Sequence, residues 1–396
     1  MRGVREHLGW GGAAALAPLA LWWGWSVVAV VRSGWGLSPA LPYLLCPLVL
    51  LAGVCLGGVV ARHADSVAVR VALVIAGLIL VIGVVMVTEP GKGPTGYTNA
   101  NAALAVQFVA ICGLALLSTA RERRRGVLVA LALGVVAVAL NRSTAGTAVA
   151  LPVFTVVALA VWLRPARRWW TAMSVAVGAL AVGFAGWVIL RAAESTPFPE
   201  WAVRAFDPVR ERLWQDAAQL WSERPLTGSG PGSFAERTVL SLDPDTMAAH
   251  SSILQVGAET GWVGVTLLAA MVLAAMLWAA RGSTPHAVIA VAAVAALLVH
   301  SMADHLLEFG SVVLAVGIVI GWAGASGRQR HDGNSEELDV TEGESPVLGW
   351  RRRGCQGPRR EERTLLRERQ QAGRPSGAQP DRVVGAGLVE HRPHEE

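Results

Sequence analysis

The sequence is poor in charged residues and has almost no lysine. Charged residues make up only 16% of the 396 residues, whereas hydrophobic residues make up 53%. A soluble domain of this length would carry roughly a quarter charged residues. Lys92 is the only lysine, and the mean hydropathy of the chain is positive. This composition excludes an ordinary soluble globular protein and indicates a membrane protein.

Cysteine is also scarce, and its placement excludes a disulfide framework. Of the four cysteines, Cys46, Cys55 and Cys112 lie within apolar runs, and Cys355 lies in a polar C-terminal stretch. Disulfide-rich domains are short and secreted, and they place their cysteines in polar loops. An internal repeat of fixed period is absent as well, which disfavours a transporter built from two similar halves.

Long apolar runs dominate the first 325 residues. Each run is about as long as a helix needs to be to cross a hydrocarbon core ~30 Å thick. Short charged or Gly/Pro-containing breaks separate the runs. We therefore predict an all-α, polytopic membrane protein of about ten transmembrane helices. We expect these spans near residues 13–31, 40–61, 68–88, 101–119, 126–141, 145–163, 170–190, 251–280, 286–304 and 309–325.

Arginine clusters occur in alternate loops, which predicts the orientation of the chain. Short cytoplasmic loops of membrane proteins are enriched in Lys and Arg. The clusters are Arg2 and Arg5; Arg62 and Arg70; Arg121, Arg123, Arg124 and Arg125; Arg164, Arg167 and Arg168; Arg281; and Arg328 and Arg330. All of them fall on one side of the predicted membrane. We expect a multi-pass protein of the inner (plasma) membrane with both termini in the cytoplasm and a large late loop outside.

Four regions follow from this topology. Residues 1–190 contain transmembrane helices 1–7, residues 191–249 form the extracytoplasmic loop, and residues 250–325 contain helices 8–10. Residues 326–396 are rich in Arg, Glu, Gly, Pro and Gln, with no periodic apolar pattern. Such a stretch cannot bury enough apolar surface to fold alone. We therefore predict a disordered cytoplasmic tail.

The long loop contains the pattern of an amphipathic helix. Asp207-Pro208 is typical of a helix start, with Asp as the N-cap and Pro at the first helical position, and the helix should end near Arg224-Pro225. Apolar residues then recur at helical spacing, which favours a position against the membrane surface. Arg212 lies on the polar side, where the simplest interpretation is a solvated pair with Asp216 four residues later.

Polar residues at the ends of the predicted spans collect on the outer side. They are Arg142, His250, Asp304, His305 and Glu308. An ionisable group at membrane depth is costly unless it is paired or hydrated, so such a group invites a functional interpretation. For any single residue, a position at the headgroup level is the alternative. Their occurrence together on one face favours a site.

The eighth predicted span carries glycines and one acidic residue. Gly257, Gly261 and Gly264 fall nearly beneath His250 on a helix, so another helix could approach closely along them. Glu259 faces the opposite side and lies about 13 Å deeper than His250 at a rise of 1.5 Å per residue. We expect Glu259 to be a poor partner for His250 and to pair within the bundle.

Three stretches together resemble the O-antigen ligase and Wzy-type polymerase family of bacterial membrane enzymes. They are Arg212-Leu-Trp214; Pro225-Leu-Thr-Gly-Ser-Gly-Pro-Gly-Ser-Phe234; and His250-Ser-Ser-Ile-Leu-Gln255 with Glu259-Thr-Gly-Trp-Val-Gly264. The similarity covers roughly residues 95–325. Ser251 stands where the family usually has Asn, and Asn141-Arg142-Ser143 stands where it usually has Ser-Arg.

The resemblance implies glycan transfer from a polyprenyl-pyrophosphate-linked donor to a glycan or lipid-sugar acceptor, within a lipid bilayer. It implies that His250 is the catalytic base and that Arg212 and Arg142 bind the donor pyrophosphate. From their position at the outer span ends, we expect Asp304 and His305 to support this site. No metal, no other cofactor and no nucleic-acid partner are expected. A polymerase and a ligase use the same donor, so both activities stay open. The alternative from another class is a transporter or flippase of lipid-linked glycans, which the near absence of ionisable residues at mid-membrane depth disfavours.

Overall fold

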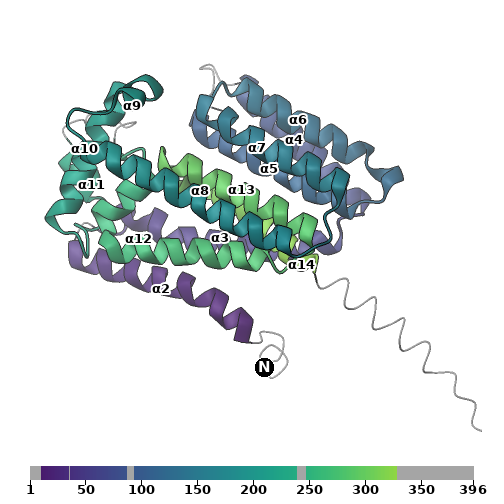
Figure 1. Cartoon of the computed structure of the whole chain (residues 1–396), viewed down its shortest axis with the longest axis horizontal. Coiled ribbons are helices and arrows are strands. Elements are labelled where there is room, and N and C mark those ends of the chain that lie inside the picture. Colours follow the sequence, from purple (N-terminus) through teal and green to yellow (C-terminus); the bar gives the residue numbers. More distant parts are fainter. Residues whose placement is uncertain (1–9, 35, 87–92, 239–246, 328–396) are drawn as a thin grey trace, which may run out of the picture. The chain divides into compact units, whose positions relative to one another are not determined.

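The computed structural model of the chain describes residues 10–34, 36–86, 93–238 and 247–327. Within these ranges every regular element is a helix, and no strand occurs (Figure 1). The all-α class predicted from the sequence is therefore confirmed. The C-terminal tail predicted at 326–396 lies outside the described residues, apart from its first two.

Eight of the helices in the described ranges are long and apolar enough to cross a membrane. They lie in α2 (Trp10–Ser33), α3 (Leu41–Arg62) with the preceding turn η1 (Ser38–Ala40), α4 (Val67–Met86), α5 (Thr98–Ser118), α7 (Thr144–Leu163), α8 (Trp169–Glu194), α12 (Ser252–Ala279) and α13 (Thr284–Met302). Two shorter apolar helices are α6 (Arg125–Leu140) and α14 (Gly310–Ala325). The chain is thus a multi-pass membrane protein. The most deeply buried of the long helices are α5 and α13.

Short helices connect α8 to α12. They are α9 (Glu200–Ala205), α10 (Pro208–Glu223) and α11 (Ser233–Arg237). The start of α10 is as predicted: Pro208 is its first residue, and the Asp207 carboxylate accepts the Val209 N–H at 2.9 Å. Two further turns, η2 (Arg121–Arg123) and η4 (Leu306–Glu308), precede α6 and α14.

The apolar face of α10 packs on protein, not on the membrane surface as the sequence suggested. Leu213, Trp214 and Ala217 are fully buried, and they belong to a cluster that includes residues of α8 and α12. An amphipathic pattern shows that one face is covered. It cannot distinguish lipid from neighbouring helices.

The helix α12 is broken at Gly261, where the backbone adopts φ 69° and ψ −170°. The loop after α10 fills the break, because Gly230 donates its N–H to the Glu259 carbonyl at 2.8 Å and Trp262 donates to the Pro225 carbonyl at 2.8 Å. A Cβ added at Gly261 would lie 2.3 Å from the backbone of that loop. The glycines of this span thus permit a close approach, as predicted: Gly261 meets the loop, whereas Gly257 meets another helix, because a Cβ added there would lie 2.3 Å from the Trp221 ring of α10.

Glycines also allow α3 and α14 to pack backbone to backbone. A Cβ added at Gly53 would lie 2.5 Å from the Leu314 carbonyl oxygen, and one added at Gly57 would lie 2.2 Å from the Ile318 carbonyl oxygen. Small residues spaced four apart are a known device for close helix packing in membranes. The pair Gly53 and Gly57 therefore fixes the distance between these helices.

Replacing Gly57 with alanine should destabilise the protein. The added methyl group meets rigid backbone, and overpacking of this kind costs about 1–3 kcal/mol. Gly58→Ala is a matched control, because a Cβ at Gly58 has nothing within 4 Å. Thermal unfolding in detergent should show a lower midpoint for Gly57→Ala and an unchanged or higher one for Gly58→Ala. Equal midpoints for the two variants would contradict the proposed packing.

Candidate functional site

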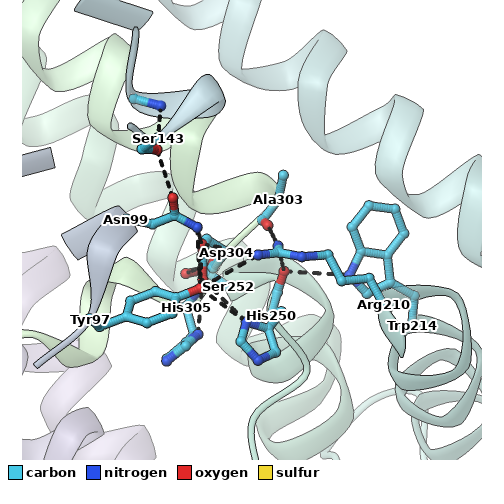
Figure 2. Close-up of polar contacts among 11 residues, drawn as sticks. Tyr97, Asn99, Ser143, Arg210, Trp214, His250, Ser252, Ala303, Asp304 and His305 are labelled. Carbon is cyan, nitrogen blue, oxygen red and sulfur yellow. Dashed lines mark hydrogen bonds and ion pairs between the residues drawn. The ribbon is translucent and has the colours of Figure 1, made fainter. Parts of the chain in front are cut away.

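The candidate site lies where several chain segments meet at one end of the bundle. Figure 2 shows side chains from the starts of α5, α7 and α10 gathered around the short segment after α13, next to the start of α12. Asp304 is at the centre of this group, and its side chain is only 1% exposed. A carboxylate buried this deeply needs several partners, since an unpaired buried charge is strongly unfavourable.

The Asp304 carboxylate receives hydrogen bonds from several neighbours. The Tyr97 hydroxyl lies 2.9 and 2.8 Å from its two carboxylate oxygens. The Asn99 side-chain amide donates to it at 2.6 Å, and the backbone N–H of His305 donates at 2.8 Å. The Asn99 carbonyl oxygen in turn accepts the Ser143 hydroxyl at 2.6 Å, which ties the start of α7 to the same network. The carboxylate is therefore held in one orientation.

Nearby positive and donor groups keep Asp304 ionised. Burial would raise the pKa of its carboxyl, but hydrogen bonds from His250 and His305 and the charge of Arg210 outweigh burial and hold this pKa well below its usual range. Burial lowers the pKa of His305, yet its contact with Asp304 gives a net rise. The pKa of the Tyr97 hydroxyl is raised by burial and by the Asp304 charge. Tyr97 therefore stays a neutral donor while Asp304 stays an anion.

His250 is held beside Asp304 in a strained conformation. Its Nδ1 atom lies 3.5 Å from an Asp304 carboxylate oxygen and 3.3 Å from the Tyr97 hydroxyl. Its backbone has φ 47°, in the left-handed region that non-glycine residues rarely adopt. The His250 carbonyl accepts hydrogen bonds from Arg210 and Trp214, both at 3.4 Å. Such strain persists only where surrounding contacts enforce it, and it concentrates at functional sites.

Gln255 anchors the residue before His250 and connects it to Glu259. Its side-chain oxygen accepts the Ala249 N–H at 2.7 Å, and its side-chain nitrogen donates to Glu259 at 3.0 Å. Glu259 also accepts the Tyr43 hydroxyl at 2.7 Å. The prediction that Glu259 pairs within the bundle is confirmed. The network nevertheless links it to the backbone beside His250.

The structure brings together three of the residues that the sequence singled out. His250, Asp304 and His305 lie in direct contact, with the two imidazole rings 4.7 Å apart. Arg212 is separate: its side chain is 56% exposed and pairs with Asp216 at 3.1 Å. Arg142 is exposed, between α6 and α7. The assignment of these two arginines to the donor stays a prediction.

Arg210 is the arginine that the structure places at the centre of the site. Its side chain is 16% exposed, and its guanidinium lies 3.4 Å from the Asp304 carboxylate. The same guanidinium donates to the Ala303 carbonyl (Figure 2). Sequence reasoning missed Arg210, although it precedes the buried Trp214 by one helical turn and so lies on the same face of α10. This four-residue spacing was the feature of the sequence that could have revealed Arg210.

Tyr97 and Asn99 were also missed. Both lie at the start of α5, where polar residues at a span end are common and carry no specific signal. Their role depends on the approach of Asp304, which is more than 200 residues later in the chain. Only the folded arrangement reveals it.

A cavity of about 550 Å³ opens beside this cluster. His250, His305, Tyr97 and Phe309 line one part of it, and Glu259 lines another. Ligand sites of enzymes typically have volumes of about 300–1,000 Å³. A small part of a substrate can therefore reach His250 through this cavity.

The cluster also has the composition of a metal site, but its charges suit proton transfer better. His250, Asp304 and His305 each offer one ligand atom, and these atoms lie within 4.8 Å of one another. The Arg210 guanidinium is 3.4 Å from the same carboxylate. A divalent cation bound to Asp304 would be repelled by this fixed positive charge.

The arrangement equips His250 to accept a proton. In the tautomer that directs Nδ1–H toward Asp304, the basic lone pair of the imidazole is on Nε2. The buried carboxylate also stabilises the imidazolium that forms. The site is therefore suited to the activation of a hydroxyl group.

Comparison with known families supports the family resemblance inferred from the sequence motifs. Residues 129–269 match the family model described as O-antigen ligase. The matched region contains α10, His250 and the broken part of α12, and it ends before Asp304. No curated protein matches the chain.

Proposed function

The chain is a membrane enzyme of the O-antigen ligase family, whose domain occupies residues 129–269, and on this basis we propose that it transfers a glycan from a polyprenyl pyrophosphate to an acceptor hydroxyl. The family predicted from the sequence motifs is thereby confirmed. The observation that carries the proposal is the contact of His250 with the buried, ionised Asp304 at the edge of a cavity. The acceptor is a glycan or a lipid-linked sugar.

The proposed reaction is a direct displacement at the anomeric carbon of the donor. Nε2 of His250 takes the proton of the acceptor hydroxyl, whose oxygen forms a bond to the anomeric carbon. The bond from that carbon to the pyrophosphate oxygen breaks, and polyprenyl pyrophosphate leaves with the electron pair. A general base of this kind contributes about 10²–10⁴-fold to the rate.

Arginine serves the leaving group in this scheme. A guanidinium stays charged and offers a planar pair of donors to phosphate oxygens, so it stabilises the negative charge that develops on the pyrophosphate. Arg210 lies nearest to His250, whereas Arg212 and Arg142 are the candidates implied by the family motifs. We propose that Arg210 serves the reaction in addition to those two and contributes more to it than Arg212.

The proposal is tested by reconstituting the purified full-length protein in liposomes with a polyprenyl-pyrophosphate glycan. The expected result is a larger glycan product and one released polyprenyl pyrophosphate for each bond formed. Movement of the donor between leaflets without bond formation would instead identify a flippase. In cells lacking the protein, single-repeat products identify a polymerase defect, and long chains on carrier lipid identify a ligase defect.

We further propose ten spans, at the ten apolar helices described above, with the orientation predicted from the sequence. The helices α6 and α14 would be the two additional spans, residues 191–249 would be extracytoplasmic, and both termini would be cytoplasmic. Support comes from the end of the bundle opposite the candidate site. There, one cavity is lined by Arg62, Arg164 and Ser326, so arginine-bearing loops converge at one end as an alternating topology requires.

Single cysteines introduced at two exposed alanines test this orientation. In a background without the native cysteines, Ala205→Cys in α9 should react with an impermeant thiol reagent added to intact cells. Ala166→Cys, in the loop between α7 and α8, should react only after the membrane is permeabilised. Both residues are exposed, so lack of labelling reports the side of the membrane. The reverse pattern would overturn the proposed orientation.

A further inference from the structure

The cavity beside His250 has an acidic lining. Among the described residues that line it are three carboxylates, Glu236, Glu259 and Glu308, and the two histidines of the site, His250 and His305, but no arginine or lysine. Glu236 and Glu308 are exposed. A pyrophosphate would be repelled by these carboxylates. The cavity is therefore a poor place for the charged part of the donor.

The other groups in the cavity are suited to a sugar ring. Tyr97 and Phe309 form a stacked aromatic pair, with ring centroids 5.6 Å apart and planes inclined by 9°, and both line the cavity. Aromatic faces cover the apolar faces of a ligand. Carboxylates accept hydrogen bonds from hydroxyl groups, and such charge-assisted bonds are stronger than neutral ones. Aromatic rings and carboxylates together therefore match an uncharged carbohydrate.

The arginines lie away from this cavity. Neither Arg210 nor any other residue of α10 is among the lining residues, yet Arg210 contacts the His250 carbonyl. His250 thus lies between a cationic side and an acidic side of the site. A displacement reaction needs the nucleophile and the leaving group on opposite sides of the reacting carbon, which this separation of charge provides.

We propose that this cavity is the acceptor subsite and that it takes a neutral or amino-bearing sugar residue, and discriminates against a phosphorylated or carboxylated one. The proposal rests on the glycan-transfer function argued above. The acceptor hydroxyl would be presented to His250 while Glu236 and Glu308 accept hydrogen bonds from neighbouring hydroxyls. The donor pyrophosphate would lie on the Arg210 side.

Steady-state transfer by the reconstituted full-length protein tests the subsite. The donor is a polyprenyl-pyrophosphate glycan and the acceptor is the lipid-linked glycan, both isolated from the protein's own cells. Glu308→Gln keeps the size of the side chain and removes its charge. We expect the KM for the acceptor to rise about tenfold, as for the loss of a hydrogen bond to a charged group, and the KM for the donor to stay unchanged. Glu236→Gln should act in the same direction.

Glu200→Gln is the matched control. Glu200 is an exposed glutamate of α9 that pairs with Arg204 and does not line the cavity, so both KM values should stay at the level of the wild type. A rise in the donor KM for Glu308→Gln, or no change in either KM, would overturn the acceptor assignment while wild-type transfer persists. Absence of transfer by the wild-type protein would instead contradict the proposed function.

Discussion

Replacing His250 with asparagine should reduce glycan transfer by about 10²–10⁴-fold, the usual contribution of a general base. Asparagine is the appropriate substitute because the backbone at this position has φ 47°. Asn tolerates the left-handed region better than Ala does, so the variant removes the proton acceptor with little added strain. The measurement is the initial rate of transfer by purified, reconstituted protein. The KM for the donor should change little.

His63→Asn is a suitable control for this experiment. His63 is exposed after α3, between predicted cytoplasmic arginines, and its replacement should leave the rate unchanged. Monodispersity in detergent reports folding for both variants. Normal transfer by a monodisperse His250→Asn protein would show that His250 is only an interfacial histidine, and the proposed mechanism would then be wrong.

The helical architecture was predictable because apolar length is a local property of the sequence. Each of the ten predicted spans corresponds to an observed helix, and the start of α10 at Pro208 follows from its capping residue alone. The break at Gly261 was not predictable in this way. It depends on the loop at Pro225–Gly230, which supplies partners for the backbone groups that the break leaves without helical bonds.

The candidate site was predictable only in part, for a related reason. His250, Asp304 and His305 could be grouped because each lies at the outer end of a predicted span. Tyr97 and Asn99 could not, since their function depends on a contact with Asp304 from a distant part of the chain. The sequence around these two residues is not distinctive, and only the tertiary structure shows that they contact the site.

The two arginines of α10 show that a functional assignment depends on which face of a helix a residue occupies. Arg210 and Arg212 are two positions apart, which corresponds to about 200° around a helix axis. One therefore faces the buried cluster and the other faces outward. The family motif drew attention to Arg212, whereas the burial of Trp214 places Arg210 toward Asp304.

We expect Arg210→Ala to reduce transfer by at least about 100-fold and Arg212→Ala to reduce it only a few-fold. Arg210 neutralises the buried Asp304 and donates to the backbone carbonyl of His250. Loss of one partner of a buried ion pair typically costs about 3–5 kcal/mol. The Arg212–Asp216 pair is half exposed, and exposed pairs contribute about 0–1 kcal/mol. Initial rates in liposomes at saturating donor and acceptor give the comparison.

Two further variants separate a role of Arg210 in catalysis from a role in folding. Arg210→Ala alone removes the guanidinium partner of the buried Asp304 carboxylate, which destabilises the folded protein. The double variant Arg210→Ala/Asp304→Asn removes both charges; it should regain monodispersity and stay inactive. Arg210→Lys keeps the charge but cannot form two parallel hydrogen bonds, so it should recover only part of kcat. Equal losses of the transfer rate for Arg210→Ala and Arg212→Ala would contradict this distinction. The exposure and the contact partners of the two arginines would then not determine which one the reaction needs.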